Sequence, residues 1–192
     1  YFTNPETGVR LGIARAGNVI GGGDWAKDRI LPDCVKAWSK NKTVDIRSPH
    51  ATRPWQHVLE PISGYLSLAA SLQEGPTLHG EPYNFGPPES QNYSVGALID
   101  EMAKSWDYVK WNDISKTQEH VHEAGLLQLN CDKALNDLHW VPTLDFEETV
   151  KMTIDWYREY YESGQSMRIF TMKQIEEYEQ MAAQRGATWA VV

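Results

Sequence analysis

Hydrophobic and polar positions over the first fifty residues predict a strand, a helix and a second short strand. Residues 10–15 form a short apolar run that leads into the glycine-rich segment 16–24, the pattern of a buried strand ending in a loop. Apolar side chains recur at helical spacing over residues 29–38, and residues 43–47 alternate like a short strand. Because ligands bind beyond the carboxyl ends of strands in open α/β sheets, segment 16–24 is a candidate ligand loop.

The following residues predict a longer helix and another strand. A loop over residues 48–54, rich in helix and strand breakers, delivers Arg53. A helix is predicted over residues 60–72, and a strand that begins near Tyr83 follows it. A helical connection of this length between two strands is typical of a parallel sheet, so the sequence predicts an α/β fold.

The rest of the chain is predicted to be mainly helical. The expected elements are a helix over 95–106, a short strand over 126–129, and helices over 132–140, 146–161 and 171–184. The last helix is strongly charged, and we expect that it can detach. We divide the chain into a strand-bearing part, residues 1–93, and a mainly helical part, residues 94–192, which interleave in space.

Charge and composition exclude several classes of protein. The net charge of −8 argues against a surface that follows nucleic-acid phosphates, because such surfaces are strongly basic. No apolar stretch approaches the roughly 20 residues that a membrane span needs, and residues 1–5 lack the pattern of a signal peptide. We therefore expect a cytoplasmic protein that binds neither nucleic acid nor membrane.

The two cysteines and the aromatic residues say little about the function. Cys34 and Cys131 have no CxxC spacing and no nearby set of Cys and His, so we expect two reduced thiols, without zinc and without a disulfide. The chain has 8 Trp and 9 Tyr but only 4 Phe, so most of its large rings carry a polar group that needs a partner. This excess is typical of a pocket or an interface.

Four short segments carry groups that suit a sugar diphosphate. Asn18 lies in the glycine-rich loop, Arg29 stands at a helix start, and Arg53 precedes a buried segment. A guanidinium donates two parallel hydrogen bonds to a diphosphate. The fourth segment contains His122 and Glu123. Each segment also has a plain structural reading: a turn for the first, surface ion pairs for the arginines, and a satisfied structural histidine for the last.

Two catalytic features are missing from the sequence. No G-x-G-x-x-G or G-x-x-G-x-x-G motif follows an opening strand, so a dinucleotide has no evident phosphate loop here. No helix carries a Tyr with a Lys four residues later, the arrangement in which a cation lowers the pKa of a catalytic phenol. These residues alone cannot complete a redox reaction.

Taken in order, the segments resemble the extended short-chain dehydrogenase/reductase family of nucleotide-sugar enzymes. The similarity covers nearly the whole chain, and its CDP-sugar subgroup is the most similar part of the family. The residues that carry it are 15–25, 49–61, 83–87 and 122–124, of which the second segment is the most specific.

The resemblance implies a protein of about twice this length, with an upstream Rossmann half that holds NAD and the catalytic Tyr and Lys. This chain would supply the C-terminal part of the NAD(P)-binding Rossmann fold, including its last parallel strands, and a small, mainly helical substrate-binding domain. The complete protein would be a homo-oligomer.

The resemblance also implies roles for individual residues. Asn18 would contact the sugar diphosphate, Arg29 would stand near the phosphates, and Arg53 would clasp the diphosphate. Arg15, Ala16 and Gly17 would pass beside the nicotinamide.

The fourth segment departs from the pattern of the wider family. Many relatives have an arginine there as a second phosphate clamp, so the roles of His122 and Glu123 stay open.

The reaction implied is the intramolecular dehydration of a CDP-sugar, with oxidation at C4, loss of water across C5 and C6, and return of the hydride to C6. This half would hold the substrate still and leave the chemistry to the other half. Two alternatives remain open from the sequence. One is an epimerase or reductase of the same family, and the other is a non-catalytic module that binds nucleotide sugars.

Overall fold

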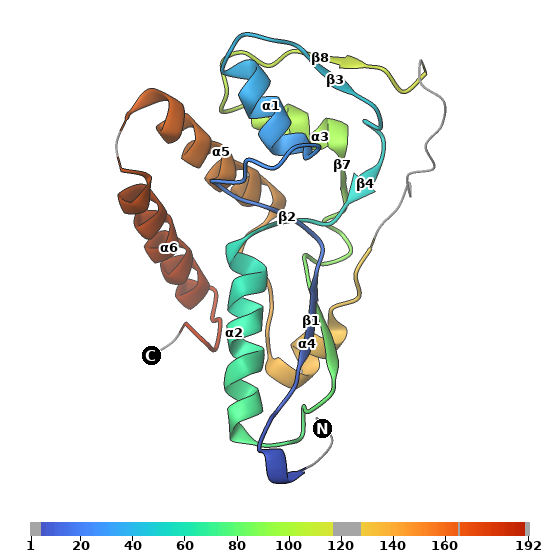
Figure 1. Ribbon diagram of the computed structural model, residues 1–192, viewed down its shortest axis with the longest axis vertical. Coiled ribbons are helices and arrows are strands. Elements are labelled where there is room, and N and C mark those ends of the chain that lie inside the picture. The colour runs from blue at the N-terminus through green and yellow to red at the C-terminus, as the bar shows by residue number, and fades with distance from the viewer. Residues whose placement is uncertain (1–4, 117–127, 165, 191–192) are drawn as a thin grey trace.

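The computed structural model describes residues 5–116, 128–164 and 166–190. The polypeptide runs through the elements labelled in Figure 1. The strands are β1 (Ile13–Ala16), β2 (Asn18–Ile20), β3 (Val44–Ile46), β4 (Thr52–Arg53), β5 (Trp55–His57), β6 (Pro82–Phe85), β7 (Tyr93–Ser94) and β8 (Trp111–Asp113). The helices are a short 3₁₀ turn (Pro5–Thr7), α1 (Ile30–Trp38), α2 (Leu59–Glu74), α3 (Val95–Met102), α4 (Asp132–Leu138), α5 (Phe146–Glu162) and α6 (Met167–Gln184).

The strands pair in two-stranded sheets. β1 pairs in parallel with β6, β2 with β5, and β3 with β8, whereas β4 and β7 are antiparallel. The parallel pairing of β1 with β6 confirms the predicted α/β arrangement. Two of the sheets are joined by a buried side chain, because Gln56 Nε2 of β5 donates to the Phe85 carbonyl of β6 at 2.9 Å.

At one end of the molecule α2 and α4 pack on the pair β1–β6 (Figure 1). Tyr83 and Phe85 of β6 are buried there, and the Phe85 ring meets the Trp140 ring edge-on at 5.0 Å between centroids. Gly64 of α2 makes this close packing possible, since a Cβ at that position would lie 2.2 Å from Phe85 Cδ1.

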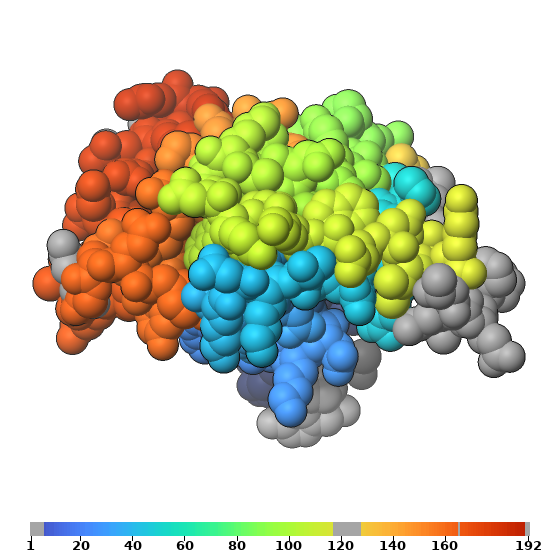
Figure 2. Space-filling model, turned by 90° about the horizontal axis from the view of Figure 1, so that it is seen from above, coloured from blue at the N-terminus to red at the C-terminus, as the bar shows by residue number. Residues whose placement is uncertain are grey.

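The larger core lies at the other end, among α1, α3 and α5. Its fully buried side chains include Leu31, Cys34, Val35, Trp38, Leu98, Ile99, Met102 and Ile154. Figure 2 looks down on this end, where the blue and cyan atoms of α1 and β3 lie against the yellow-green atoms of α3 and β8. Apolar residues at the helical spacing predicted for α1 therefore form one wall of the main core.

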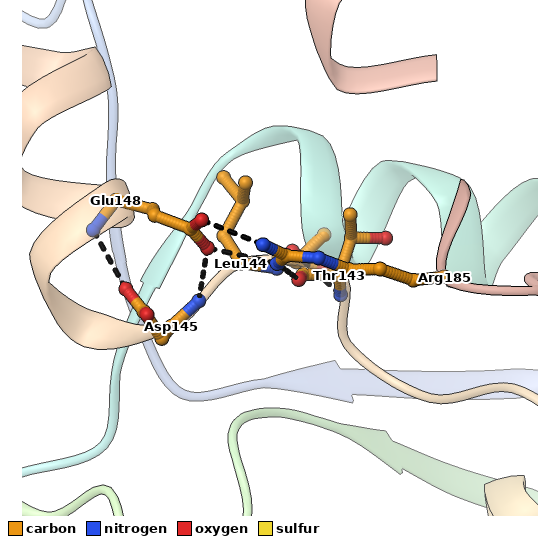
Figure 3. Close-up of polar contacts among 6 residues, drawn as sticks. Thr143, Leu144, Asp145, Glu148 and Arg185 are labelled. Carbon is orange, nitrogen blue, oxygen red and sulfur yellow. Dashed lines mark hydrogen bonds and ion pairs between the residues drawn. The ribbon is translucent and has the colours of Figure 1, made fainter. Parts of the chain in front are cut away.

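The C-terminal helix α6 is firmly docked, so the expectation of a detachable tail was wrong. Gln174, Tyr178 and Ala182 are buried against the body, because uncharged side chains on one face of α6 follow helical spacing among the charges. The helix begins at Met167, four residues before the predicted start. Arg185 follows it and makes paired hydrogen bonds of 2.6 and 2.8 Å to Glu148 (Figure 3).

Other boundaries differ in smaller ways. The helix predicted over 95–106 ends at Met102. The predicted strand over 126–129 lies partly outside the described residues, and its described positions 128 and 129 are not in a strand. Both cysteines are free thiols, with Cys34 buried and Cys131 half-buried. No helix in the described part of the chain is long and apolar enough to cross a membrane. The division at residue 93 stays a prediction.

Candidate functional site

A cleft of about 850 Å³ opens at the carboxyl ends of β1 and β3 and beside β2 and β4. The sequence-predicted residues that line it are Arg15, Ala16, Gly17, Asn18, Arg29 and Arg53. Residues 38 positions apart in the sequence thus share one cavity.

Backbone pairing between β2 and β5 positions Asn18 in the cleft. Asn18 of β2 stands opposite Trp55 of β5 in the parallel register. Gly17 is close-packed, since a Cβ there would lie 3.0 Å from Pro54 Cγ and 3.2 Å from Leu129 Cδ1. Any larger residue at this position would force Pro54 and Leu129 to shift by a few tenths of an ångström.

Arg53 is held rigidly in the wall. It is only 8% exposed, although it lines the cleft, and its Nη1 donates to the Thr52 carbonyl at 2.8 Å. It pairs across β4–β7 with Tyr93, whose ring stacks on Phe146 at 3.9 Å between centroids. Few orientations are available to a guanidinium held this way, so little entropy is lost when it binds an anion.

Arg29 is more loosely held. It immediately precedes α1, and 60% of its side chain is exposed. Its Nη1 lies 3.7 Å from Asp24 Oδ2, a distance at which an exposed ion pair is weak. The cleft therefore combines a fixed guanidinium with an adjustable one.

The sequence interpretation missed further charged residues in the cleft. Arg47, directly after β3, is a fourth arginine in the cleft beside Arg15, Arg29 and Arg53, and Asp24, Asp28, Asp33 and Asp45 also line the cavity. A usable signal existed, since Arg47 is the last residue of the strand predicted over residues 43–47 and so stands at a strand's carboxyl end. The mixture of charges suits a ligand that carries both an anionic group and hydroxyl or amino donors.

His57 has a structural environment. It is 3% exposed, and its Nδ1 accepts the Leu59 amide at 3.3 Å. Burial lowers the pKa of His57 to about 4, so the ring is neutral at physiological pH. The His57 ring is thus part of the buried structure and not a charged group of the cleft.

His122 and Glu123 lie outside the described residues, so their predicted contact with substrate stays a prediction. Among the described residues no group of three or more His, Cys, Asp or Glu side chains is arranged to hold a metal ion.

Comparison with curated proteins identifies two relatives. The chain is 40% identical over 182 residues to the CDP-glucose 4,6-dehydratase of Salmonella typhimurium strain LT2, a match that covers 92% of this chain and 50% of that protein. It is 31% identical over 109 residues to a dTDP-glucose 4,6-dehydratase of Streptomyces antibioticus, covering 56% of this chain and 30% of that protein. No family model matches. The chain spans half the length of the Salmonella relative, and its match to the Streptomyces relative covers less than a third of that protein.

Solved structures with the same fold include nucleotide-sugar epimerases. A UDP-glucuronic acid 4-epimerase from Bacillus cereus, in complex with UDP-glucuronic acid and NAD, aligns with a TM-score of 0.66 and 20% identity over 80% of this chain and 47% of that one. A UDP-glucose 4-epimerase from Thermotoga maritima, with UDP-glucose, aligns with a TM-score of 0.65 and 21% identity over 82% and 49%. The predicted fold class and the resemblance to nucleotide-sugar enzymes are confirmed.

Proposed function

We propose that this chain is the substrate-holding half of a CDP-glucose 4,6-dehydratase, an NAD-dependent lyase that converts CDP-D-glucose to CDP-4-dehydro-6-deoxy-D-glucose. The observation that carries the proposal is the convergence of Asn18, Arg29 and Arg53 on one cleft. These residues come from three separate segments of the sequence, and the Salmonella relative is a CDP-glucose 4,6-dehydratase.

In this proposal the two guanidiniums bind the diphosphate. Arg53 provides a fixed pair of donors from the wall, and Arg29 closes on the phosphates from the exposed side. Asn18 offers an amide donor and an acceptor to the sugar. Holding the sugar in one orientation while its C4, C5 and C6 react is the catalytic contribution of this half.

The residues present fit one wall of an NAD site. Arg15, Ala16 and Gly17 stand at the carboxyl end of β1 and line the cleft, and two of them have side chains too small to block a flat ring. Bound NAD would supply the hydride chemistry of the reaction, and Arg15, Ala16 and Gly17 would lie beside it. This chain would orient the sugar toward that wall and exclude water from it.

The surface of β1 supports an upstream Rossmann half as partner. Ile13 is 44% exposed, and Ile62 and Leu66 of the neighbouring helix α2 are 42% and 66% exposed. Parallel strands are normally covered on both faces, so an exposed apolar strand of this kind calls for further strands and helices. The homo-oligomeric state and the cytoplasmic location remain parts of the proposal.

A binding experiment tests the substrate-holding role. The chain is titrated with CDP-glucose and with CDP by calorimetry, and Arg29→Ala and Arg53→Lys are compared with it. Loss of a charge-assisted hydrogen-bond pair is expected to weaken binding about tenfold or more. Arg168→Ala, at an exposed position of α6 outside the cleft, is the matched control and should bind as the unaltered chain does. Absence of binding by the unaltered chain would refute the proposal.

The similarity to solved epimerases favours one alternative, an epimerase of the same fold. Product analysis of a polypeptide that also contains the NAD-binding half separates the two. Formation of a 4-keto-6-deoxy sugar supports the dehydratase, whereas a sugar with only one inverted hydroxyl group supports the epimerase.

A further inference from the structure

The segment between β2 and α1, residues 21–29, has no regular secondary structure, yet it carries Arg29 to the cleft. Its glycines leave the backbone many conformations, and fixing them costs conformational entropy. Contacts elsewhere in the molecule must therefore hold this segment in one position.

An aromatic anchor on α5 provides those contacts. We define it as Trp156 and Tyr157 together with Trp25 of the segment, whose ring meets the Tyr157 ring edge-on at 5.2 Å. Trp156 fills the space beside Gly22, where a Cβ would lie 2.0 Å from Trp156 Cγ. Lys36 of α1 adds a hydrogen bond of 2.6 Å from Nζ to the Trp25 carbonyl. Contacts of Trp25 and Gly22 with the aromatic rings of α5 therefore hold the segment against this helix.

One polar contact connects the anchor to the cleft. The Tyr157 hydroxyl donates to the Asp24 carbonyl at 2.6 Å. Burial raises the pKa of Tyr157, so the hydroxyl keeps its proton and remains a donor. The Asp24 side chain is fixed as well, because its Oδ1 accepts the Ala26 amide at 2.9 Å. Its other oxygen, Oδ2, is the one that lies 3.7 Å from Arg29 Nη1.

We propose that Tyr157 is a positioning residue for Arg29: it fixes Asp24, and the Asp24 carboxylate keeps the guanidinium at the mouth of the cleft until a diphosphate takes it over. This inference rests on the proposed function, because it assumes that the cleft binds a diphosphate. The exposed ion pair of Arg29 is weak enough to exchange for the stronger, bidentate hydrogen bonds of a phosphate. Asp24 thus orients the cation without competing for it.

The test is a double-mutant cycle on CDP binding, measured by calorimetry with the full chain. Tyr157→Phe removes only the hydroxyl and keeps the ring in the anchor. Its loss is expected to weaken CDP binding about two- to tenfold, the effect of one hydrogen bond. In the Arg29→Ala background the same substitution should change the affinity for CDP by less than about 1.5-fold, since Tyr157 acts through Arg29.

Tyr160→Phe is the matched control. Tyr160 lies on the same helix and meets the Trp25 ring at 4.9 Å, but its hydroxyl makes no hydrogen bond within the described residues. We expect Tyr160→Phe to bind CDP as the unaltered chain does. A purely structural Tyr157 would lower the thermal midpoint in both backgrounds and leave the affinity for CDP unchanged.

Three outcomes overturn the inference, and each is distinguishable. If the unaltered chain does not bind CDP, the proposed function fails and the inference fails with it. If CDP binds and Arg29→Ala has no effect, Arg29 is not a ligand to be positioned. If Tyr157→Phe binds as tightly as the unaltered chain, or weakens binding equally in both backgrounds, the chain of contacts does not act through Arg29. Should Tyr157→Phe not fold, Asp24→Asn, which removes the charge that faces Arg29, enters the same cycle with the same expectation.

Discussion

The buried carboxylate of Glu60 gives the sharpest prediction about stability. Glu60 stands in the first turn of α2 and is 1% exposed. Its oxygens accept the backbone amides of Thr143 and Leu144 at 2.9 and 2.7 Å and the Tyr178 hydroxyl at 3.0 Å. One side chain thus joins α2, the segment before α5, and α6. Figure 3 shows that segment, where Arg185 lies between Glu148 and Thr143.

The magnitude follows from the pKa. Burial raises the pKa of Glu60 from its ordinary value of 4.5 to about 7, and its hydrogen bonds and the charge of Arg185 only partly oppose this. One unit of pKa corresponds to about 1.4 kcal/mol. A carboxyl with a raised pKa stabilises the fold below the unfolded pKa and loses that contribution as the pH rises through the folded pKa. The free energy of unfolding should therefore fall by about 3 kcal/mol between pH 4.5 and pH 8.

The perturbation that isolates this effect is Glu60→Gln. The amide keeps one oxygen for the two backbone donors, and its NH₂ group faces the Tyr178 hydroxyl, which can accept as well as donate. Urea unfolding of both proteins is followed by far-UV circular dichroism at pH 5, 6, 7 and 8. The free energy of unfolding of Glu60→Gln, relative to the unaltered chain, should rise steadily over this range. A difference that does not change with pH would refute the reasoning, and one that falls with pH would mean that the hydrogen bonds outweigh burial.

Two further predictions concern packing and thiol chemistry. Gly22→Ala places a Cβ 2.0 Å from Trp156 Cγ, so it should destabilise the fold by about 1–3 kcal/mol and weaken CDP binding. Gly75→Ala is the control, because no atom lies nearer than 4.0 Å to the added Cβ, and it should change neither stability nor binding. Equal urea midpoints for the two variants would contradict this prediction. Burial raises the pKa of the Cys34 thiol to about 12. At pH 8 an aromatic disulfide reagent should therefore label Cys131 in the native protein and Cys34 only in urea. Equal labelling rates of the two thiols in the native protein would show that Cys34 is accessible.

Elements with strong periodicity could be predicted from the sequence. The helices α1 and α5 begin within one residue of their predicted starts, because each buries an apolar stripe at helical spacing. The strands β2, β4, β5, β7 and β8 were missed. Each has two or three residues, and β5 buries the polar side chains Gln56 and His57 together with Trp55. A strand that buries polar groups on both faces has no alternation for a pattern to detect.

The candidate site could be predicted in part for the same reason. Arg29 and Arg53 were found because an arginine beside a predicted helix start or a predicted buried segment can be recognised from the sequence alone. Asp24 was missed because its place in the cleft depends on which segments pack together, whereas Arg47 stands at the end of a predicted strand and could have been found. No local pattern shows that α5, more than a hundred residues further along, holds the carbonyl of Asp24.

The residues that sequence patterns overlook include polar side chains that join separate elements of the fold. Gln56 joins β5 to β6, Glu60 joins α2 to α6, and Tyr157 joins α5 to the segment that carries Arg29, each through a buried or half-buried hydrogen bond. Such groups have directional requirements that apolar packing lacks, and an unsatisfied partner costs more than a lost methylene group. Tyr157→Phe removes one hydroxyl and leaves its ring in place, so it should cost the fold less than truncation of a core leucine.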